Sequence, residues 1–410
     1  MLRKRYLERS HDMAKYSMLN KADVSLDVII LFIIGMIMLI TGTLLFPVSA
    51  GILPYYENGL YGLLLFIFAL QMITLGKTPF REMRQSKLLL IIGVVIASIG
   101  IVTCFIPDIF NPIPRILLSL CFGPGGILLL IQMVFSKEKL RSWLQYGRSF
   151  HHLIFGCGAV YLLSMLIGML IWDHSLFSTS ITAVTILIYG VAIVYLAETL
   201  RRIYRMYPEA EKSREGDIDL SSDKAMILVT AIFMQLLGIL LIPVNWGLLP
   251  FSGSAQLGLL MVIFAVQMLA FGNTPIGPFF RSWLMILFGF IFAALGIISC
   301  IIPEILVSPL TVLIGALNII GGITTLGKTC LPLFKKGRNP HLPTPRILVK
   351  LYVTQLAMNL VAILFGVSMF VSHLIPGQII GVILTANGCI LLYLLHILSL
   401  IDKIRAEGTN

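Results

Sequence analysis

The sequence has few charged residues and no recognisable catalytic motif. Asp, Glu, Lys and Arg make up 12% of the chain, well below the roughly 25% of soluble domains. It contains no HExxH, no GxSxG, no P-loop and no pair of carboxylates within an apolar run. These absences argue against the enzyme classes that such motifs serve. We therefore expect a protein with no catalytic residues and no cofactor.

The cysteines also lack the spacing of a metal or redox site. None belongs to a CxxC pair, and all lie in or beside apolar runs. They are Cys104, Cys121, Cys157, Cys300, Cys330 and Cys389. Free cysteine commonly serves as a small buried apolar side chain. The sequence therefore predicts no metal site.

Long apolar segments fill the chain instead, and 58% of its residues are hydrophobic. Most segments approach the ~20 residues that a helix needs to cross the hydrocarbon core. They span residues 26–46, 59–76, 88–106, 113–135, 152–172, 178–200, 225–243, 255–272, 283–302, 307–327, 348–372 and 376–401. Segments 59–76 and 255–272 are short and suit a locally thinned membrane. The sequence predicts an all-α polytopic protein with about twelve transmembrane helices, in contact with the lipid bilayer.

Basic residues fall in alternate loops, which predicts the orientation of the chain. With the N-terminus inside, 29 of the 30 Lys and Arg residues face the cytoplasm, and Arg115 alone lies outside. This asymmetry follows the positive-inside rule. We expect a plasma (inner) membrane protein with cytoplasmic termini, facing the anionic lipids of the inner leaflet. The net charge of +11 then has a membrane explanation and calls for no nucleic acid.

The chain contains an internal repeat with an offset of 196 residues. Of the 18 positions in 62–79, 11 match their partners in 258–275 without a gap. Six helices per unit is an even number, so both units enter the membrane in the same direction, related by an axis along the membrane normal. The predicted units are a basic tail (1–25), a first repeat (26–204), a charged cytoplasmic linker (205–224), a second repeat (225–402) and a short cytoplasmic tail (403–410).

A weaker pattern divides each repeat into three helical hairpins. Two helices carry glycines seven residues apart and then reach a proline at the outer turn. The residues are Gly35, Gly42 and Pro47 in one helix and Gly93, Gly100 and Pro107 in the other. Glycines with this spacing share a helix face and permit close packing, and we expect the proline to end the helix.

These glycines and prolines resemble the short-repeat membrane proteins of the HdeD type. The second-half partners agree except that Ala231 stands where Gly35 would recur, and the resemblance covers about 26–135 and 225–330. It implies six-helix units, here used twice, in a non-enzymatic protein associated with bacterial acid resistance or acting as a membrane scaffold. It supplies no catalytic residues.

Four polar residues within the apolar segments are candidate pathway or interhelical contacts. Gln71 and Gln267 occupy equivalent positions in the repeats, and an amide in lipid must find a partner, so each should contact another helix. Glu198 and His396 are equivalent under an offset of 198. They suggest either a proton-passing pair or two local contacts, with Glu198 bound to nearby arginines.

The predicted outer surface carries carboxylates. Asp108 and Glu304 each follow the turn proline of a second hairpin, and Glu57 and Asp173 lie on the same side. Solvated surface charge is their simplest interpretation.

Two further function classes compete with the HdeD-like scaffold. One is a secondary transporter or channel for a small solute, with its pathway between the two six-helix repeats. The other is an intramembrane enzyme, which the shortage of ionisable residues disfavours. A polar cavity between the repeats would favour transport, whereas a dry interface would favour the scaffold. The sequence names no substrate and no oligomeric state.

Overall fold

The structure, a computed structural model of the whole chain, confirms the helices predicted from the sequence. It describes residues 24–80, 86–135, 148–173, 178–207, 221–274, 276–279, 281–336, 346–371 and 376–407. In these residues twelve helices are long and apolar enough to cross a membrane. They are α2 (Leu26–Ser49), α3 (Glu57–Leu75), α4 (Lys87–Phe105), α5 (Ile113–Phe135), α7 (Arg148–Trp172), α8 (Thr179–Met206), α9 (Ser222–Asn245), α10 (Gly253–Phe271), α11 (Trp283–Ile301), α12 (Val307–Lys336), α13 (Arg346–Phe370) and α14 (Gly377–Glu407). The fold is therefore that of an all-α polytopic membrane protein.

Some predicted segments fall partly or wholly outside the described residues. These are residues 1–23 of the basic tail, residues 208–220 of the linker and the final residues 408–410. Helix α14 continues to Glu407, past the boundary predicted at residue 402. A two-stranded turn, β1 (Asn273–Thr274) and β2 (Gly277–Pro278), follows α10 and was not predicted.

Local sequence signals explain where several helices begin and end. The hydroxyl oxygens of Ser86, Ser252 and Ser282 each accept a hydrogen bond from a backbone N–H of the following first turn, at 3.3 Å. Such N-caps satisfy a donor that the helix cannot. Gly76 and Gly272 end α3 and α10 in left-handed conformations, with φ values of 66° and 68°. Glycine commonly ends a helix in this way because it adopts the left-handed conformation without strain.

Helix α2 does not end at its outer-turn proline, contrary to the sequence prediction, whereas α4 ends at Phe105, just before Pro107, as predicted. Helix α2 continues past Pro47 to Ser49, and its N–H groups bond in the Schellman pattern. Gly51, at φ 72°, donates to the carbonyl of Val48, and Ile52 donates to the carbonyl of Pro47, both at 2.9 Å. The glycine sets the end of the helix because it accepts the left-handed conformation that this motif requires.

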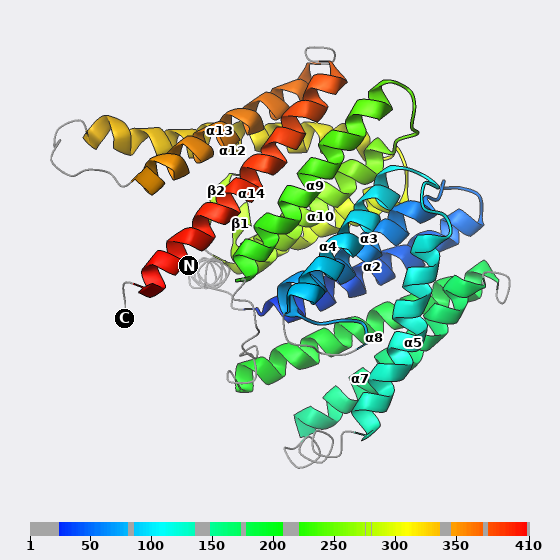
Figure 1. Cartoon of the computed structure of the whole chain (residues 1–410). Helices are drawn as coiled ribbons and strands as arrows, with labels where there is room; N and C mark the ends of the chain where they lie inside the picture. The colour runs from blue at the N-terminus through cyan, green and yellow to red at the C-terminus, as the bar shows by residue number, and fades with distance from the viewer. Residues whose placement is uncertain are drawn as a thin grey trace, which may run out of the picture.

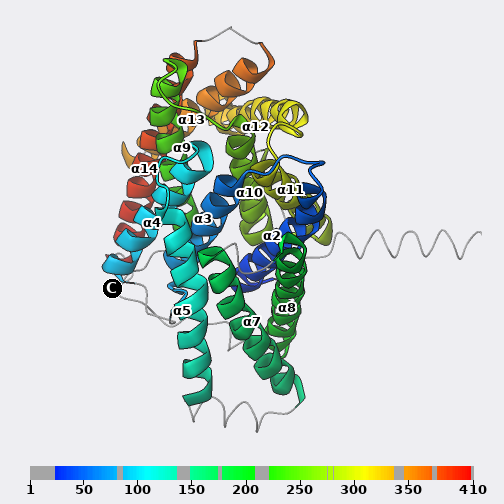
Figure 2. The same cartoon turned by 90° about the vertical axis from the view of Figure 1, so that its right-hand side faces the viewer.

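Close packing pairs the helices within each half, and the same pairs recur in the other half (Figures 1 and 2). Helix α2 packs on α8, α3 on α4, and α5 on α7; the corresponding pairs are α9 with α14, α10 with α11, and α12 with α13. The pairs α5–α7 and α12–α13 lie at opposite extremities of the molecule. Helices α3 and α10 lie at its centre and are the most deeply buried.

These pairs differ from the hairpins predicted from the sequence. Helices α2 and α3 share an outer turn, yet each packs mainly on another helix. The glycines of α2 explain the choice: a Cβ added at Gly35 or Gly42 would lie 2.7 Å from Val194 or Leu187 in α8. The predicted glycine face therefore exists, but it receives α8 and not the next helix in the chain.

The two halves meet through equivalent backbone hydrogen bonds. The N–H of Tyr56 donates to the carbonyl of Ile301 at 2.9 Å. The N–H of Ser252 donates to the carbonyl of Phe105, also at 2.9 Å. An offset of 196 converts Tyr56 to Ser252 and Phe105 to Ile301. Each half thus offers the same donor and the same acceptor to the other.

Side chains at this interface are apolar at the point of closest approach. The Phe105 ring contacts those of Phe233 and Phe251 edge-on, with centroids 5.7 and 6.1 Å apart. Cys104 and Cys300 lie beside them and are fully buried. Aromatic pairs in this geometry add about 0.5–1.5 kcal/mol to the burial of their surfaces. These aromatic rings and buried thiols make the interface apolar at this point.

At the end of the bundle opposite Phe105, charged and polar groups join neighbouring helices within each half. Asp27 at the start of α2 pairs with Lys77 after α3 at 2.5 Å, and accepts a hydrogen bond from the Tyr204 hydroxyl of α8 at 3.2 Å. In the second half Lys224 of α9 pairs with Asp402 of α14 at 2.5 Å. We call the end that carries these two ion pairs the basic end, because nearly all Lys and Arg residues lie on this side in the predicted topology. The charge asymmetry predicts that it faces the cytoplasm.

Candidate functional site

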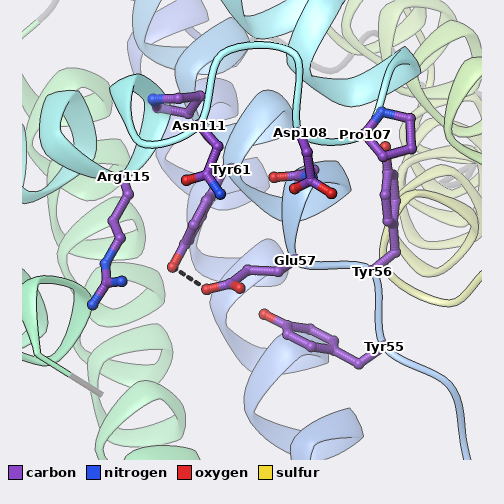
Figure 3. A pocket seen from close by; sticks show the side chains of 10 residues that line it. Tyr55, Tyr56, Glu57, Tyr61, Pro107, Asp108, Asn111 and Arg115 are labelled. Atoms are coloured by element: carbon purple, nitrogen blue, oxygen red, sulfur yellow. Dashed lines mark hydrogen bonds between the residues drawn. The ribbon is translucent and has the colours of Figure 1, made fainter. Parts of the chain in front are cut away.

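A pocket of about 470 Å³ opens at the end of the bundle opposite the basic end. It lies between the N-terminus of α3, the turn from α4 to α5 and the first turn of α5 (Figure 3). The lining residues are Tyr55, Tyr56, Glu57, Asn58, Tyr61, Pro107, Asp108, Asn111, Pro114 and Arg115. Sites for small molecules commonly have volumes of about 300–1,000 Å³, so this pocket has the size of a ligand site.

The start of α3 supplies the aromatic wall and one carboxylate. Glu57 lies in the first turn, where the helix dipole favours a negative charge. The hydroxyl of Tyr61, one turn further along, donates a hydrogen bond to Glu57 Oε1 (Figure 3). Tyr56 donates to the carbonyl of Cys104 at 3.2 Å. In Figure 3 the Tyr55 ring lies below Glu57, with its hydroxyl turned toward the carboxylate.

Asp108 supplies the second carboxylate from the turn between α4 and α5. Its Oδ1 accepts a hydrogen bond from the Asn58 amide at 3.1 Å. Its backbone has a φ of 59°, and Glu304 at the equivalent position has a φ of 70°. Left-handed conformations are uncommon for residues other than glycine, although Asp tolerates them. Both residues are exposed, as predicted for surface charge, but Asp108 also lines a pocket.

Arg115 carries the positive charge of the pocket, and its guanidinium donates hydrogen bonds to α7 and not to the two carboxylates. Its Nε donates to the carbonyl of Ile171 at 2.7 Å, and one terminal nitrogen donates to the carbonyl of Trp172 at 2.6 Å. These carbonyls belong to the C-terminal end of α7, where the helix dipole favours a cation. In Figure 3 Tyr61 separates the guanidinium from Glu57 and Asp108.

Two phenols that line the pocket, Tyr55 and Tyr56, stay neutral over a wide pH range. Burial, and secondly the negative charge of Glu57, raise the pKa of Tyr55 well above its ordinary value. Burial also raises the pKa of Tyr56, with smaller effects from Cys104, Asp108 and Cys300. The lining therefore has a formal charge of −1, from two carboxylates and one guanidinium, beside neutral aromatic rings.

The polar character of this pocket belongs to the first half of the chain. Apart from Asp108, whose counterpart is Glu304, the offset of 196 replaces the polar lining residues by smaller or apolar ones. The replacements are Gly253 for Glu57, Ser254 for Asn58, Leu257 for Tyr61, Val307 for Asn111 and Thr311 for Arg115. A packing role would apply equally to both halves, because both carry the same turn, so the asymmetry favours a role in binding.

The two repeated glutamines have different surroundings. The Gln267 amide of α10 donates to Thr230 Oγ1 of α9 at 3.0 Å. The equivalent of Thr230 in the first half is Ile34, which has no acceptor in its side chain. Gln71 is half-buried, and within the described ranges its side chain has no hydrogen-bond partner. The structure thus places an interhelical contact at one glutamine only.

Glu198 and His396 are not brought together. Glu198 pairs with Arg201 at 3.0 Å and with Arg202 at 3.3 Å, all on α8. Helix α8 packs on α2 and α7, whereas α14, which carries the exposed His396, packs on α9 and α13. The local ion pair is the interpretation that this geometry supports for Glu198.

The sequence analysis did not identify most of the pocket. Tyr55, Tyr56 and Tyr61 resemble ordinary aromatic anchors at a membrane interface, and Asn58 resembles a loop residue. The available signal was the comparison of the two repeats, because polar residues confined to one copy of a duplicated turn mark a specialised position. Among the described residues no group of His, Cys, Asp and Glu side chains has the arrangement of a metal site.

Comparisons with protein-family models, with curated proteins and with solved structures found no match to the chain.

Proposed function

We propose that the chain is a non-enzymatic membrane protein built from two parallel six-helix repeats. The same helix pairs form within each half. The hydrogen bonds from Tyr56 and Ser252 to the opposite half are equivalent under the repeat offset. A two-fold axis along the membrane normal relates repeats of this kind. In this proposal the three hairpins of each repeat are units of sequence duplication, while close packing joins helices of different hairpins.

The proposed role is that of a membrane scaffold in envelope or acid stress tolerance, as the HdeD resemblance implies. The observation that supports the non-transport part is the apolar packing between the halves. Phe105, Phe233 and Phe251 fill its centre together with the buried Cys104 and Cys300. A solute pathway there would need polar groups to replace lost hydration. The proposed location is the plasma (inner) membrane, with the basic end toward the cytoplasm.

The test combines reconstitution with a stress assay. Purified protein in liposomes should leave the permeability to small solutes and ions equal to that of protein-free liposomes. A strain lacking the gene should lose survival after acid exposure and regain it with the wild-type chain. Saturable solute flux through the liposomes would instead establish the transporter alternative. Unchanged survival of the deletion strain would contradict the stress role.

A further inference from the structure

We propose that the pocket at the start of α3 binds an organic ammonium group. Its lining combines three tyrosine rings with the carboxylates of Glu57 and Asp108. Ammonium groups bind to the faces of aromatic rings and to nearby carboxylates. An anion would meet a lining of net negative charge, and Arg115 already donates to the carbonyls that end α7.

The shape of the pocket suits a small organic cation more than a bare metal ion. Its volume of about 470 Å³ far exceeds the space that one ion occupies, whereas it lies within the range for small molecules. Tyr55 and Tyr56 remain neutral phenols because burial raises their pKa values. They therefore add aromatic rings to the lining without adding a positive or negative charge.

The position of the pocket permits two sources of the ammonium group. The pocket lies at the ends of the helices, and its lining residue Asp108 is exposed at the surface of the bundle. A soluble amine can enter from water, and the amine headgroup of a phospholipid can enter from the membrane surface. Both present the same chemistry, and they differ in whether the surrounding lipids compete with a soluble cation.

The comparison of the two repeats supplies the matched control. Glu304 occupies the place of Asp108 in the second repeat, with the same left-handed backbone, but does not line this pocket. Asp108→Asn removes one charge and keeps both the shape and the tolerance for a positive φ. Tyr55→Phe removes a hydroxyl and keeps the ring, as Phe251 does in the second repeat, whereas Tyr55→Leu removes the ring.

The experiment measures choline binding by calorimetry to the full chain in nanodiscs of phosphatidylglycerol. We expect saturable binding. Tyr55→Leu should raise Kd about threefold to thirtyfold, the range that corresponds to loss of a cation–π contact. Asp108→Asn should raise Kd by a similar factor because it removes a nearby opposite charge. Glu304→Gln and Tyr55→Phe should change Kd less than about twofold. The uncharged isostere of choline, with carbon in place of the ammonium nitrogen, should not compete.

A second set of nanodiscs contains phosphatidylethanolamine. Weaker apparent choline binding there, restored by omitting the amine lipid, would identify the headgroup as the source, and unchanged binding would identify a soluble amine. The proposal is overturned if choline fails to bind in the phosphatidylglycerol discs. It is also overturned if the isostere competes equally or if Glu304→Gln weakens binding as much as Asp108→Asn. The result is independent of whether liposomes show solute flux.

Discussion

The thiols of Cys104 and Cys300 both lie near the carbonyl oxygen of Ala255, at 3.9 and 3.6 Å. The two cysteines are equivalent under the repeat offset and come from α4 and α11. Sharing one carbonyl oxygen places the two sulfur atoms within reach of one small crosslinker. The pair therefore reports directly on how the halves meet.

We predict that Cys104 and Cys300 can be joined covalently. The variant to test retains these two cysteines, replaces the other four by alanine, and carries a protease site between residues 208 and 220. After treatment with a mercuric salt, which bridges two thiolates, and cleavage at that site, the halves should migrate as one species. A thiol reductant in excess should release them.

The matched control retains Cys104 and Cys389 instead. Cys389 lies on α14, which packs on α9 and α13, so this pair should not be bridged and cleavage should separate the halves. Separation of the halves in the Cys104–Cys300 variant as well, once titration shows that both buried thiols have reacted with mercury, would contradict the interface described here.

The twelve helices could be predicted from the sequence because membrane insertion depends on length and hydropathy, which are local properties. The partners of each helix could not be predicted from the same signals. Gly35 and Gly42 indicate that some helix approaches α2 closely, but the identity of that helix depends on side chains of α8. The expected hairpin partner and the observed partner are both apolar, so composition does not distinguish them.

The candidate site could likewise be predicted only in part from the sequence. The exposure of Asp108 and Glu304 followed from their place after an outer-turn proline. The pocket beside Asp108 depends on how the α4–α5 turn meets the start of α3, a contact between residues 50 positions apart. In the sequence, only a residue-by-residue comparison of the two repeats indicates this pocket.

Close helix contact at the glycines of α3 and α10 gives the second prediction. A Cβ added at Gly62 or Gly258 would lie 2.5 Å from the carbonyl oxygen of Gly100 or Gly296. Because the obstacle is backbone, Gly62→Ala and Gly258→Ala should each cost about 1–3 kcal/mol through overpacking. The measurement is thermal unfolding of the purified protein in detergent.

Gly253 provides the control for this series. It begins α10, and an added Cβ would meet no atom within 4 Å. Gly253→Ala should be neutral or should stabilise the protein by about 0.4–1 kcal/mol, because it restricts the unfolded chain. Equal melting temperatures for Gly62→Ala and Gly253→Ala would mean that α3 and α4 are further apart than described.

The third prediction concerns orientation in the membrane. In a cysteine-free background, a membrane-impermeant maleimide added to intact cells should label Ala50→Cys and should not label Glu215→Cys. Ala50 is exposed at the end of α2 opposite the basic end, and position 215 lies in the linker, outside the described residues. Cationic segments resist translocation, so the linker should remain inside. Labelling at position 215 before lysis would refute the orientation.

The last prediction separates the two repeated glutamines. Gln267 donates across the gap between α10 and α9 to Thr230, so Gln267→Leu should destabilise the protein by about 0.6 kcal/mol, with an upper range near 2 kcal/mol. The value is small because the unfolded state within the membrane also finds partners for the amide. Gln71→Leu should cost less, since Ile34 offers no equivalent acceptor.

A double-mutant cycle tests whether the Gln267–Thr230 contact is the cause. Thr230→Val keeps the shape of the side chain and removes the acceptor, so its effect and that of Gln267→Leu should not add. Gln71→Leu combined with Thr230→Val should add, because among the described residues no hydrogen bond joins Gln71 to Thr230. Additivity in the first pair would show that the hydrogen bond contributes nothing. Loss of stress tolerance at unchanged stability would instead assign these glutamines to a pathway, against the apolar interface that Phe105 and its neighbours form.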